Sequence, residues 1–173
     1  MASMLKLILL RHAKSAWTQD GQSDFERRLN ERGIADCKEM SGRLSKRQLR
    51  PQRIICSSAT RATETASLVA RELGLPAGTL VFDKRLYLAE AADLMVVLNA
   101  QSAQDTTLML VGHNPGITAF ANRLGDGYVD DMPTCCYAEI SFEAKRWSDV
   151  DWAAGQLVHV DWPKNIVGQG SEN

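Results

Sequence analysis

Two histidines and two arginines of this 173-residue sequence stand just beyond short apolar runs. The runs are Leu5–Leu10, Arg53–Ser57 and Thr107–Val111, and each is typical of a strand buried in a sheet. The residues beyond them are Arg11, His12, Arg61 and His113. The carboxyl ends of parallel strands meet at one edge of a sheet, where ligands bind. We therefore expect both imidazoles and both guanidinium groups to converge on one site.

These four side chains suit the transfer of a phosphoryl group. A guanidinium binds two phosphate oxygens at once, and helix N-termini expected near Thr60 and Asn114 add further donors. A neutral imidazole accepts a phosphoryl group at pH 7, because its ordinary pKa lies near about 6.5. The residues therefore predict phosphoryl transfer through a phosphohistidine, in which the protein mainly positions groups and neutralises charge.

The elements that must position these residues alternate between apolar runs and segments with helical periodicity. Further strands are expected at Leu80–Phe82, Tyr137–Phe142 and Gln156–Trp162, and helices at residues 31–45, 60–73, 91–100 and 117–124. Asn30 and Asn114 are expected N-caps, Pro115 suits a first helical turn, and Gly74 suits a left-handed helix end. This alternation predicts α/β architecture, a three-layer α/β/α sandwich with a mainly parallel central sheet.

The composition fits one domain over residues 1–173, with a polar tail from about residue 168. Apolar residues make up 45%, and no apolar run approaches the roughly 20 residues that cross a bilayer. A net charge of -1 gives little support for nucleic-acid binding. The first apolar run is too short and too interrupted for a signal peptide, so we expect a cytoplasmic protein. Nothing in the sequence demands more than a monomer.

Three motifs with their surroundings resemble one known family. They are Leu9-Leu10-Arg11-His12-Ala13-Lys14-Ser15, Ser57-Ser58-Ala59-Thr60-Arg61-Ala62-Thr63-Glu64-Thr65-Ala66 and Val111-Gly112-His113-Asn114-Pro115-Gly116, with Arg27-Arg28-Leu29 and Gly33 between the first two. The chain resembles the histidine phosphatase (phosphoglycerate-mutase-like) superfamily over most of its length and in the same order. It looks most like the small SixA-type phosphohistidine phosphatases, which share a compact length and a late Trp-rich strand region.

The resemblance implies a catalytic role for the four residues. His12 matches the nucleophile, and Arg11, Arg61 and His113 match the phosphate pocket, where His113 stabilises charge in the transition state. In the expected reaction neutral His12 attacks phosphorus in line, and water then hydrolyses the phosphohistidine. No metal or other cofactor is required. The expected partners are a phosphorylated protein or a small phosphorylated substrate.

Other positions refine this comparison. Arg27 is similar to an additional phosphate-facing arginine of the SixA-type branch, and Ser15 and Asn114 border the motifs as candidate hydrogen-bonding residues. Ala13 replaces the glycine that follows the histidine in mutases, and Thr18 stands where mutases carry an asparagine. The chain also lacks the inserts that shape the mutase sugar-phosphate pocket. A phosphatase is therefore favoured over a phosphomutase.

The sequence does not decide which residue, if any, is the general acid. Glu90 follows the region where many superfamily members place a proton-donating carboxylate, but it also suits the start of a solvated helix. An alcohol leaving group needs a proton as the P–O bond breaks, whereas the imidazole of a phosphohistidine leaves with little help. A weak acid site therefore points towards a phosphoramidate substrate such as phosphohistidine.

The remaining residues whose side chains could bind a metal ion or a charged partner are expected to have structural roles. His159 is expected at a surface or edge, and three histidines without ligand spacing make a zinc site improbable. Asp126 and Asp130-Asp131 do not fit a calcium loop. A basic stretch suits a helix C-terminus, with a docking patch for an acidic protein as the alternative. Its members are Arg43, Lys46, Arg47, Arg50 and Arg53.

Three alternative functions stand beside the dephosphorylation of phosphohistidine. A cysteine phosphatase would use Cys56 with Arg61, but that class needs five intervening residues and this chain has four without a glycine. We expect all four cysteines to be reduced and mostly buried. A non-catalytic phosphate-binding module would keep the arginines, although the pair of histidines argues against it. A small-molecule phosphomonoesterase of the same superfamily is the third alternative.

Overall fold

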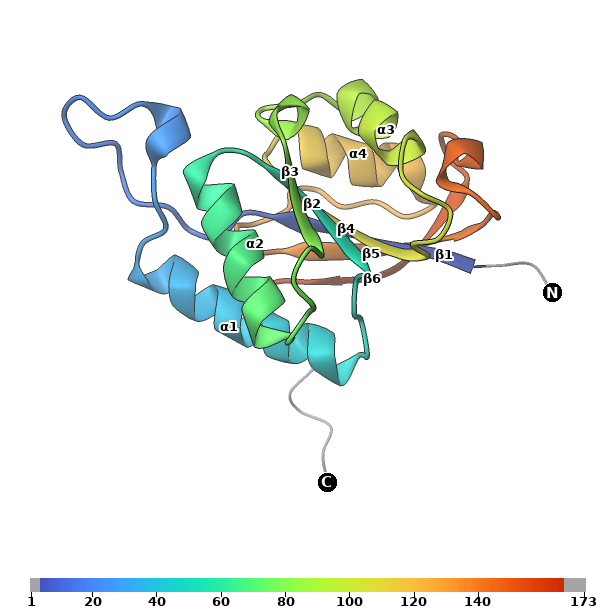
Figure 1. Cartoon of the computed structure of the whole chain (residues 1–173), viewed down its shortest axis with the longest axis horizontal. Helices are drawn as coiled ribbons and strands as arrows, with labels where there is room; N and C mark the ends of the chain where they lie inside the picture. The colour runs from blue at the N-terminus through green and yellow to red at the C-terminus, as the bar shows by residue number, and fades with distance from the viewer. Residues whose placement is uncertain (1–3, 167–173) are drawn as a thin grey trace.

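The computed structural model describes residues 4–166, in which six strands form one sheet (Figure 1). The strands are β1 (Met4–Arg11), β2 (Arg53–Ser57), β3 (Leu80–Asp83), β4 (Thr107–Gly112), β5 (Tyr137–Glu143) and β6 (Gly155–Asp161). Their order is β3-β2-β4-β1-β5-β6; β3, β2, β4 and β1 are parallel, and the pairs β1–β5 and β5–β6 are antiparallel. The mainly parallel sheet is confirmed. The polar tail expected from about residue 168 lies outside the described residues.

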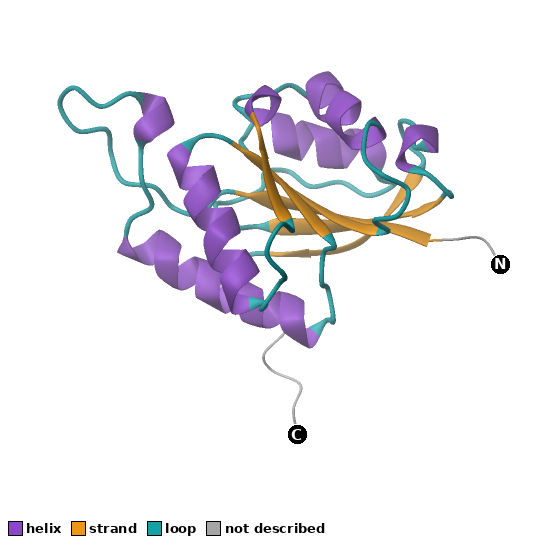
Figure 2. Cartoon of the chain, viewed as in Figure 1, coloured by secondary structure: helices purple, strands orange, loops and turns teal. Residues whose placement is uncertain are grey.

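Helices cover both faces of the sheet, which confirms the three layers (Figures 1 and 2). The helices α1 (Glu31–Lys46) and α2 (Thr60–Glu72) lie on one face, and α3 (Ala91–Asn99) and α4 (Gly116–Leu124) lie on the other. Short 3-10 turns occur at Asp24–Glu26, Lys84–Leu86 and Trp147–Asp149. The helices predicted from periodicity all form, with ends that differ by one residue at most.

Strand β1 is buried on both sides because its side chains alternate between two cores. Leu5, Leu7 and Leu9 pack in the core beneath α3 and α4, whereas Ile8 and Leu10 pack in the core beneath α1 and α2. All five side chains are fully buried. A central strand covered by helices on both faces must be apolar at every position, which explains the continuous run in the sequence.

Two predicted helix boundaries are confirmed by their local contacts. The Asn30 side chain accepts a hydrogen bond from the Gly33 N–H at 2.8 Å and so caps α1. A Cβ atom at Gly33 would collide with the Lys14 carbonyl, so this position needs glycine for the close approach of α1 to the chain after β1. Beyond α2, Gly74 has φ +61°, the left-handed conformation expected there.

The predicted N-cap of α4 is wrong. Pro115 occupies the cap position, and the helix begins at Gly116. The Asn114 side chain does not cap, because its oxygen accepts from the Thr118 hydroxyl at 2.7 Å while its amide donates to Asp131 and Met132. Its hydrogen-bonding groups therefore join α4 to the loop before β5.

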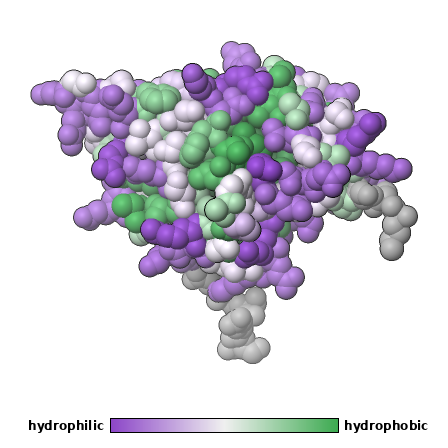
Figure 3. Space-filling view, viewed as in Figure 1, coloured by the Kyte–Doolittle hydropathy of each residue, from purple (hydrophilic) through white to green (hydrophobic). Residues whose placement is uncertain are grey.

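The surface carries apolar residues along the sheet edge formed by β3. Figure 3 shows a green area across the face on which β3 lies, and Val81 and Phe82 of this strand are partly exposed. Within the part of the chain that the structure describes, no helix has the length and apolarity that a membrane span requires.

Candidate active site

Strand register brings the predicted residues to one edge of the sheet. Arg11 at the end of β1 pairs with Gly112 at the end of β4, and the His12 N–H donates to the Gly112 carbonyl at 3.1 Å. On the far side of β4, Cys56 pairs with Val111, so β2 ends at the same level. The residues that follow these strands are therefore neighbours in space, as the parallel arrangement predicts.

The His12 imidazole is held as one neutral tautomer. Its Nδ1 lies 2.8 Å from the Ala13 carbonyl, which only accepts, so Nδ1 carries the proton. Its Nε2 then has a free electron pair and accepts from the Nε–H of Arg61 at 3.3 Å. Burial lowers the pKa of His12 to about 4; the bond to Ala13 opposes this shift, and the charge of Arg61 reinforces it. His12 is therefore neutral and nucleophilic at pH 7.

Arg61 is buried although it lies in the first turn of α2. Besides its bond to His12, its guanidinium donates to the backbone carbonyl of Asp24 at 2.7 Å and to the Asp24 carboxylate at 3.1 Å. A cation at a helix N-terminus is unfavourable without such a partner. Asp24 therefore stabilises the orientation in which Arg61 reaches the imidazole.

His113 and Arg11 each bury a polar atom that has no hydrogen-bond partner among the described residues. His113 accepts from or donates to the Ser57 hydroxyl through Nε2 at 2.7 Å, while its Nδ1 is unpaired. Arg11 donates to the Met132 carbonyl at 2.9 Å, while its Nε is unpaired. Burial lowers the pKa of His113 to about 3, so it too is neutral at pH 7. Unpaired buried polar atoms are costly, and since both of these residues line the cavity described below, the two atoms are candidates for contact with a ligand there.

These residues surround one cavity of about 290 Å³. The ring centroids of His12 and His113 are 5.1 Å apart. The lining residues are Arg11, His12, Lys14, Ser15, Ala16, Trp17, Arg27, Asn30, Arg61, Leu88, His113, Asn114 and Thr134. Four of these are cations and none is a carboxylic acid. The cavity therefore suits a small anion of high charge density, as a phosphoryl group is.

A family model described as the histidine phosphatase superfamily (branch 1) matches residues 7–86, which carry the first two of the three motifs. The chain belongs to this superfamily. An uncharacterized protein of Mycobacterium tuberculosis is 32% identical over 165 residues, which cover 90% of this chain and 100% of that protein.

Two solved structures of proteins named SixA are similar to this chain along most of its length. The SixA protein from Agrobacterium tumefaciens is 27% identical, with a TM-score of 0.76, and the likeness covers 91% of this chain and 97% of that one. The protein histidine phosphatase SixA complexed with tungstate has a TM-score of 0.80 at 19% identity and covers 94% of this chain and 99% of that one. The latter likeness shows that the fold is shared.

The three residues predicted to bind phosphate or substrate beside the catalytic four all line the cavity of this histidine phosphatase superfamily member; they are Arg27, Ser15 and Asn114. Arg27 donates to the Ser15 hydroxyl at 2.8 Å and to the Asp24 carboxylate at 3.1 Å. Ser15 therefore helps to hold the Arg27 guanidinium in position. Asn114 has its amide and its oxygen engaged with Asp131, Met132 and Thr118, so its role there is to shape the wall.

Two other predicted residues lie apart from the cavity lining. Glu90 is the N-cap of α3: its carboxylate accepts from the Asp93 N–H, and the Asp93 carboxylate accepts from the Glu90 N–H. This matches the helix-start interpretation of Glu90, and a role as general acid finds no support in the geometry. Cys56 is fully buried, and burial raises the pKa of its thiol well above the usual range, which argues against a cysteine nucleophile.

Several residues that position the site were not among those predicted from the sequence. Asp24 joins Arg27 and Arg61, and its hydrogen bond from the Tyr87 hydroxyl at 2.6 Å is the main reason that its pKa is lowered to about 2. Tyr87 in turn packs edge-on against the His113 ring. Nothing local marks Asp24 as special, because it is an ordinary residue of a polar loop. Of these positioning residues, only Ser57 had a signal in the sequence, because it ends a predicted strand.

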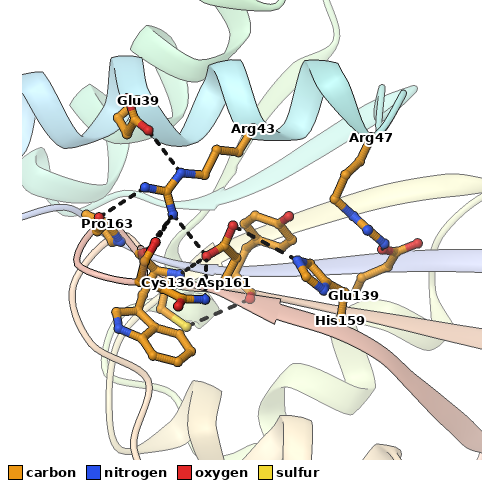
Figure 4. Close-up of polar contacts among 11 residues, drawn as sticks. Glu39, Arg43, Arg47, Cys136, Glu139, His159, Asp161 and Pro163 are labelled. Atoms are coloured by element: carbon orange, nitrogen blue, oxygen red, sulfur yellow. Dashed lines mark hydrogen bonds and ion pairs between the residues drawn. The ribbon is translucent and has the colours of Figure 1, made fainter. Parts of the chain in front are cut away.

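The arginines of the basic stretch bind carboxylates and carbonyls of other elements and so hold the fold together. Arg43 and Arg47 reach from α1 to carboxylates of β6 and β5, Asp161 and Glu139, as Figure 4 shows. His159 lies between them on the edge strand β6, half-exposed as expected (Figure 4). Arg50 and Arg53 also donate to neighbouring loops. With four of its five cations engaged, the stretch offers little free charge for docking an acidic protein.

The four cysteines and the acidic residues of the loops have structural places in the fold. All four cysteines are free and buried, as predicted. Asp126 accepts from the Leu157 N–H at 2.8 Å, and Asp131 accepts from Asn114, so both carboxylates support loops. Among residues 4–166, no group of three or more His, Cys, Asp or Glu side chains is arranged to hold a metal ion.

Proposed function

We propose that this chain is a metal-independent phosphatase that removes the phosphoryl group from phosphohistidine on a partner protein. The attacking atom is Nε2 of His12, whose electron pair forms the new N–P bond. The P–N bond of the substrate breaks, and its imidazole takes a proton from solvent. Water then attacks phosphorus, which releases inorganic phosphate and restores neutral His12. No cofactor takes part.

The site residues divide the remaining work. Arg11, Arg27 and Arg61 neutralise the phosphoryl oxygens, which carry the charge in a loose transition state. His113 donates from Nδ1 to an equatorial oxygen, because its Nε2 accepts the Ser57 proton in this tautomer. The support for this assignment is that the buried Nδ1 has no other partner among the described residues.

One observation favours phosphohistidine over a phosphoester. No described residue that lines the cavity is a carboxylic acid, and the nearby Asp24 is held as an anion with a pKa of about 2. Glu90 is used by its helix cap. An alcohol leaves poorly without a proton donor, whose contribution is on the order of 10²–10⁴ in rate. An imidazole leaves without one, so the site fits a phosphoramidate.

A substrate panel tests this function. Phosphohistidine protein, phosphoserine peptide and glycerol 3-phosphate, whose leaving groups are an imidazole and two alcohols, are offered to the native chain and to His12→Ala. We expect kcat/KM for phosphohistidine to exceed that for the esters by about 100-fold, the low end of the general-acid contribution. Equal or faster turnover of the esters would identify a phosphomonoesterase instead. Turnover that survives His12→Ala would exclude the mechanism.

A second test separates an enzyme from a binding module. After incubation with a phosphodonor, we expect an acid-labile, base-stable phosphoryl label on His12. A chain that takes no label and turns over no member of the panel, yet binds tungstate tightly, would be a phosphate-binding module.

A further inference from the structure

We propose that a second cavity beside the reaction cavity binds an acidic stretch of the substrate polypeptide; this inference rests on the proposed function. The second cavity has a volume of about 240 Å³ and is lined by Lys14, Arg32, Asp36, Pro133, Thr134, Trp162, Pro163 and Lys164. These residues come from the ends of β1 and β6, the start of α1 and the loop before β5. It therefore lies at the same edge of the sheet as the reaction cavity.

The charge of the second cavity selects for an anion. Lys14, Arg32 and Lys164 contribute three positive charges, and Asp36 contributes the one negative charge. Asp36, whose side chain is largely covered, pairs loosely at 3.6 Å with the more exposed Arg32 one turn earlier in α1. Within residues 4–166 neither lysine ammonium has an ion-pair partner, so a net charge of about two remains for a ligand.

The wall of the second cavity is fixed by a buried arginine. Arg43 of α1 donates to the carbonyls of Trp162, Pro163 and Asn165 at 2.9–3.1 Å and to the Asp161 carboxylate at 3.0 Å. Figure 4 shows this guanidinium reaching across to the segment that follows β6. Since both charged side chains are almost buried, the segment that supplies Trp162, Pro163 and Lys164 is held in place before any ligand arrives.

The two cavities are adjacent, because Lys14 and Thr134 line both. The backbone of Lys14 is fixed by the Asn30 N–H, which donates to its carbonyl at 3.0 Å. A polypeptide whose phosphohistidine enters the reaction cavity can therefore continue past Lys14 into the second cavity.

The lining favours an acidic side chain of a polypeptide over a bare anion. Trp162, Pro133 and Pro163 form an apolar wall next to the cations. An aspartate or glutamate on a peptide brings a carboxylate for the lysines together with methylene groups and backbone for the apolar wall. Surface pairs of this kind contribute modestly one by one, so we expect about tenfold in affinity from the cluster.

Two phosphohistidine peptides test the proposal. One carries three glutamates after the phosphohistidine, and the other carries three glutamines of nearly the same size. Affinity is measured by fluorescence anisotropy with the His12→Ala chain, which holds the peptides without turnover, and kcat/KM is measured with the native chain. We expect the glutamate peptide to bind about tenfold tighter, with the preference lost in high salt.

Charge-removing variants locate the effect. Arg32→Gln with Lys164→Gln is expected to abolish the preference while leaving kcat/KM for the glutamine peptide unchanged. Lys145→Gln is the matched control, because Lys145 is exposed beyond β5 and lines neither cavity. Equal affinities of the two peptides for the parent chain would overturn the proposal, as would a preference that persists in the double variant.

The outcomes separate this inference from the proposed function. If neither peptide is hydrolysed but phosphoesters are, the proposed function fails, while the anisotropy measurement still decides whether the second cavity takes acidic peptide. A third peptide with phosphoserine in place of one glutamate checks the ligand class. If it binds tightly while the glutamate peptide behaves like the glutamine peptide, the cavity takes phosphate and the proposal of a carboxylate site is wrong.

Discussion

The Nε–H of Arg61 points at Nε2 of His12 across 3.3 Å, so the atom proposed as nucleophile faces a permanent donor. A guanidinium never accepts, and this contact therefore excludes a proton on Nε2. The Ala13 carbonyl fixes the other proton on Nδ1 at the same time. Arg61 thus keeps Nε2 of His12 unprotonated and sets positive charge beside the nucleophile. When a phosphoryl group enters, the guanidinium can pass from Nε2 to a phosphoryl oxygen and so release the electron pair for attack.

The pH profile of kcat/KM should show the lowered pKa of His12. Burial places this pKa at about 4, so we expect kcat/KM to stay level from pH 7 to about 5 and to fall tenfold per unit below about 4. A fall that begins near pH 6.5, the ordinary value of an imidazole, would contradict this assignment.

Folding must be monitored in the same pH range. His12 and His113 both have folded-state pKa values below those of the unfolded chain, so the unfolded chain binds more protons as the pH falls from about 6.5. Stability therefore declines towards acid pH. Tryptophan fluorescence at each pH separates this loss from protonation of the nucleophile.

Asp24 should act as a positioning residue for the arginines. Its carboxylate holds Arg61 and Arg27 at 3.1 Å each, yet it does not line the cavity. In Asp24→Asn we expect kcat to fall about tenfold because the guanidinium groups lose their alignment, a cost typical of small misplacements. Inorganic phosphate should inhibit this variant less strongly, because Arg27 and Arg61 are also the groups that bind phosphate.

Asp20→Asn is the matched control for this prediction, since Asp20 lies in the same loop and is exposed. We expect it to leave both kcat and phosphate inhibition unchanged. If Asp24→Asn lowered kcat while phosphate inhibition stayed as in the native chain, Asp24 would not act through the alignment of Arg27 and Arg61.

Neither the Cys56 thiol nor a metal ion should be needed for activity. The Cys56 thiol is fully buried and donates to the Ser57 carbonyl at 3.1 Å, a contact that a serine hydroxyl can keep. We therefore expect Cys56→Ser to retain activity within about threefold, and EDTA to have no effect, whereas His12→Ala loses at least about 10³-fold. Loss of turnover in EDTA, or an inert Cys56→Ser that remains folded, would count against the His12 mechanism.

The sequence predicted the parts of the molecule that local pattern controls. The run Leu5–Leu10 indicated a strand buried on both faces, and β1 does divide its side chains between two cores. The ends of three such strands then placed His12, Arg61 and His113 together. Each of these inferences needs only periodicity and the rule that parallel strands end at one edge.

Contacts between distant loops could not be predicted in this way. Asp24 meets Arg61 across 37 positions, and Tyr87 meets Asp24 across 63, through loops with no periodic signal. Asn114 had the residue type of an N-cap, but Thr118 and the loop before β5 compete for its side chain. Residue type alone does not decide such a competition, because the competing groups are set by tertiary structure.

Arg43 should contribute strongly to stability as well as to the second cavity. Its side chain is 14% exposed and that of Asp161 is 12% exposed, so Arg43→Met removes the positive partner of a nearly buried carboxylate and the arginine donor of three carbonyls. The Asp161 carboxylate keeps its uncharged donors, the Trp162 N–H and the Asn165 amide. Breaking a buried pair from one side costs about 3 kcal/mol, which urea denaturation would measure. The control Arg146→Met breaks an exposed pair with Asp149 and should change stability by less than about 1 kcal/mol. If both variants lost equally little, the segment after β6 would be held by its apolar contacts rather than by Arg43, and the preformed wall of the second cavity would need another explanation.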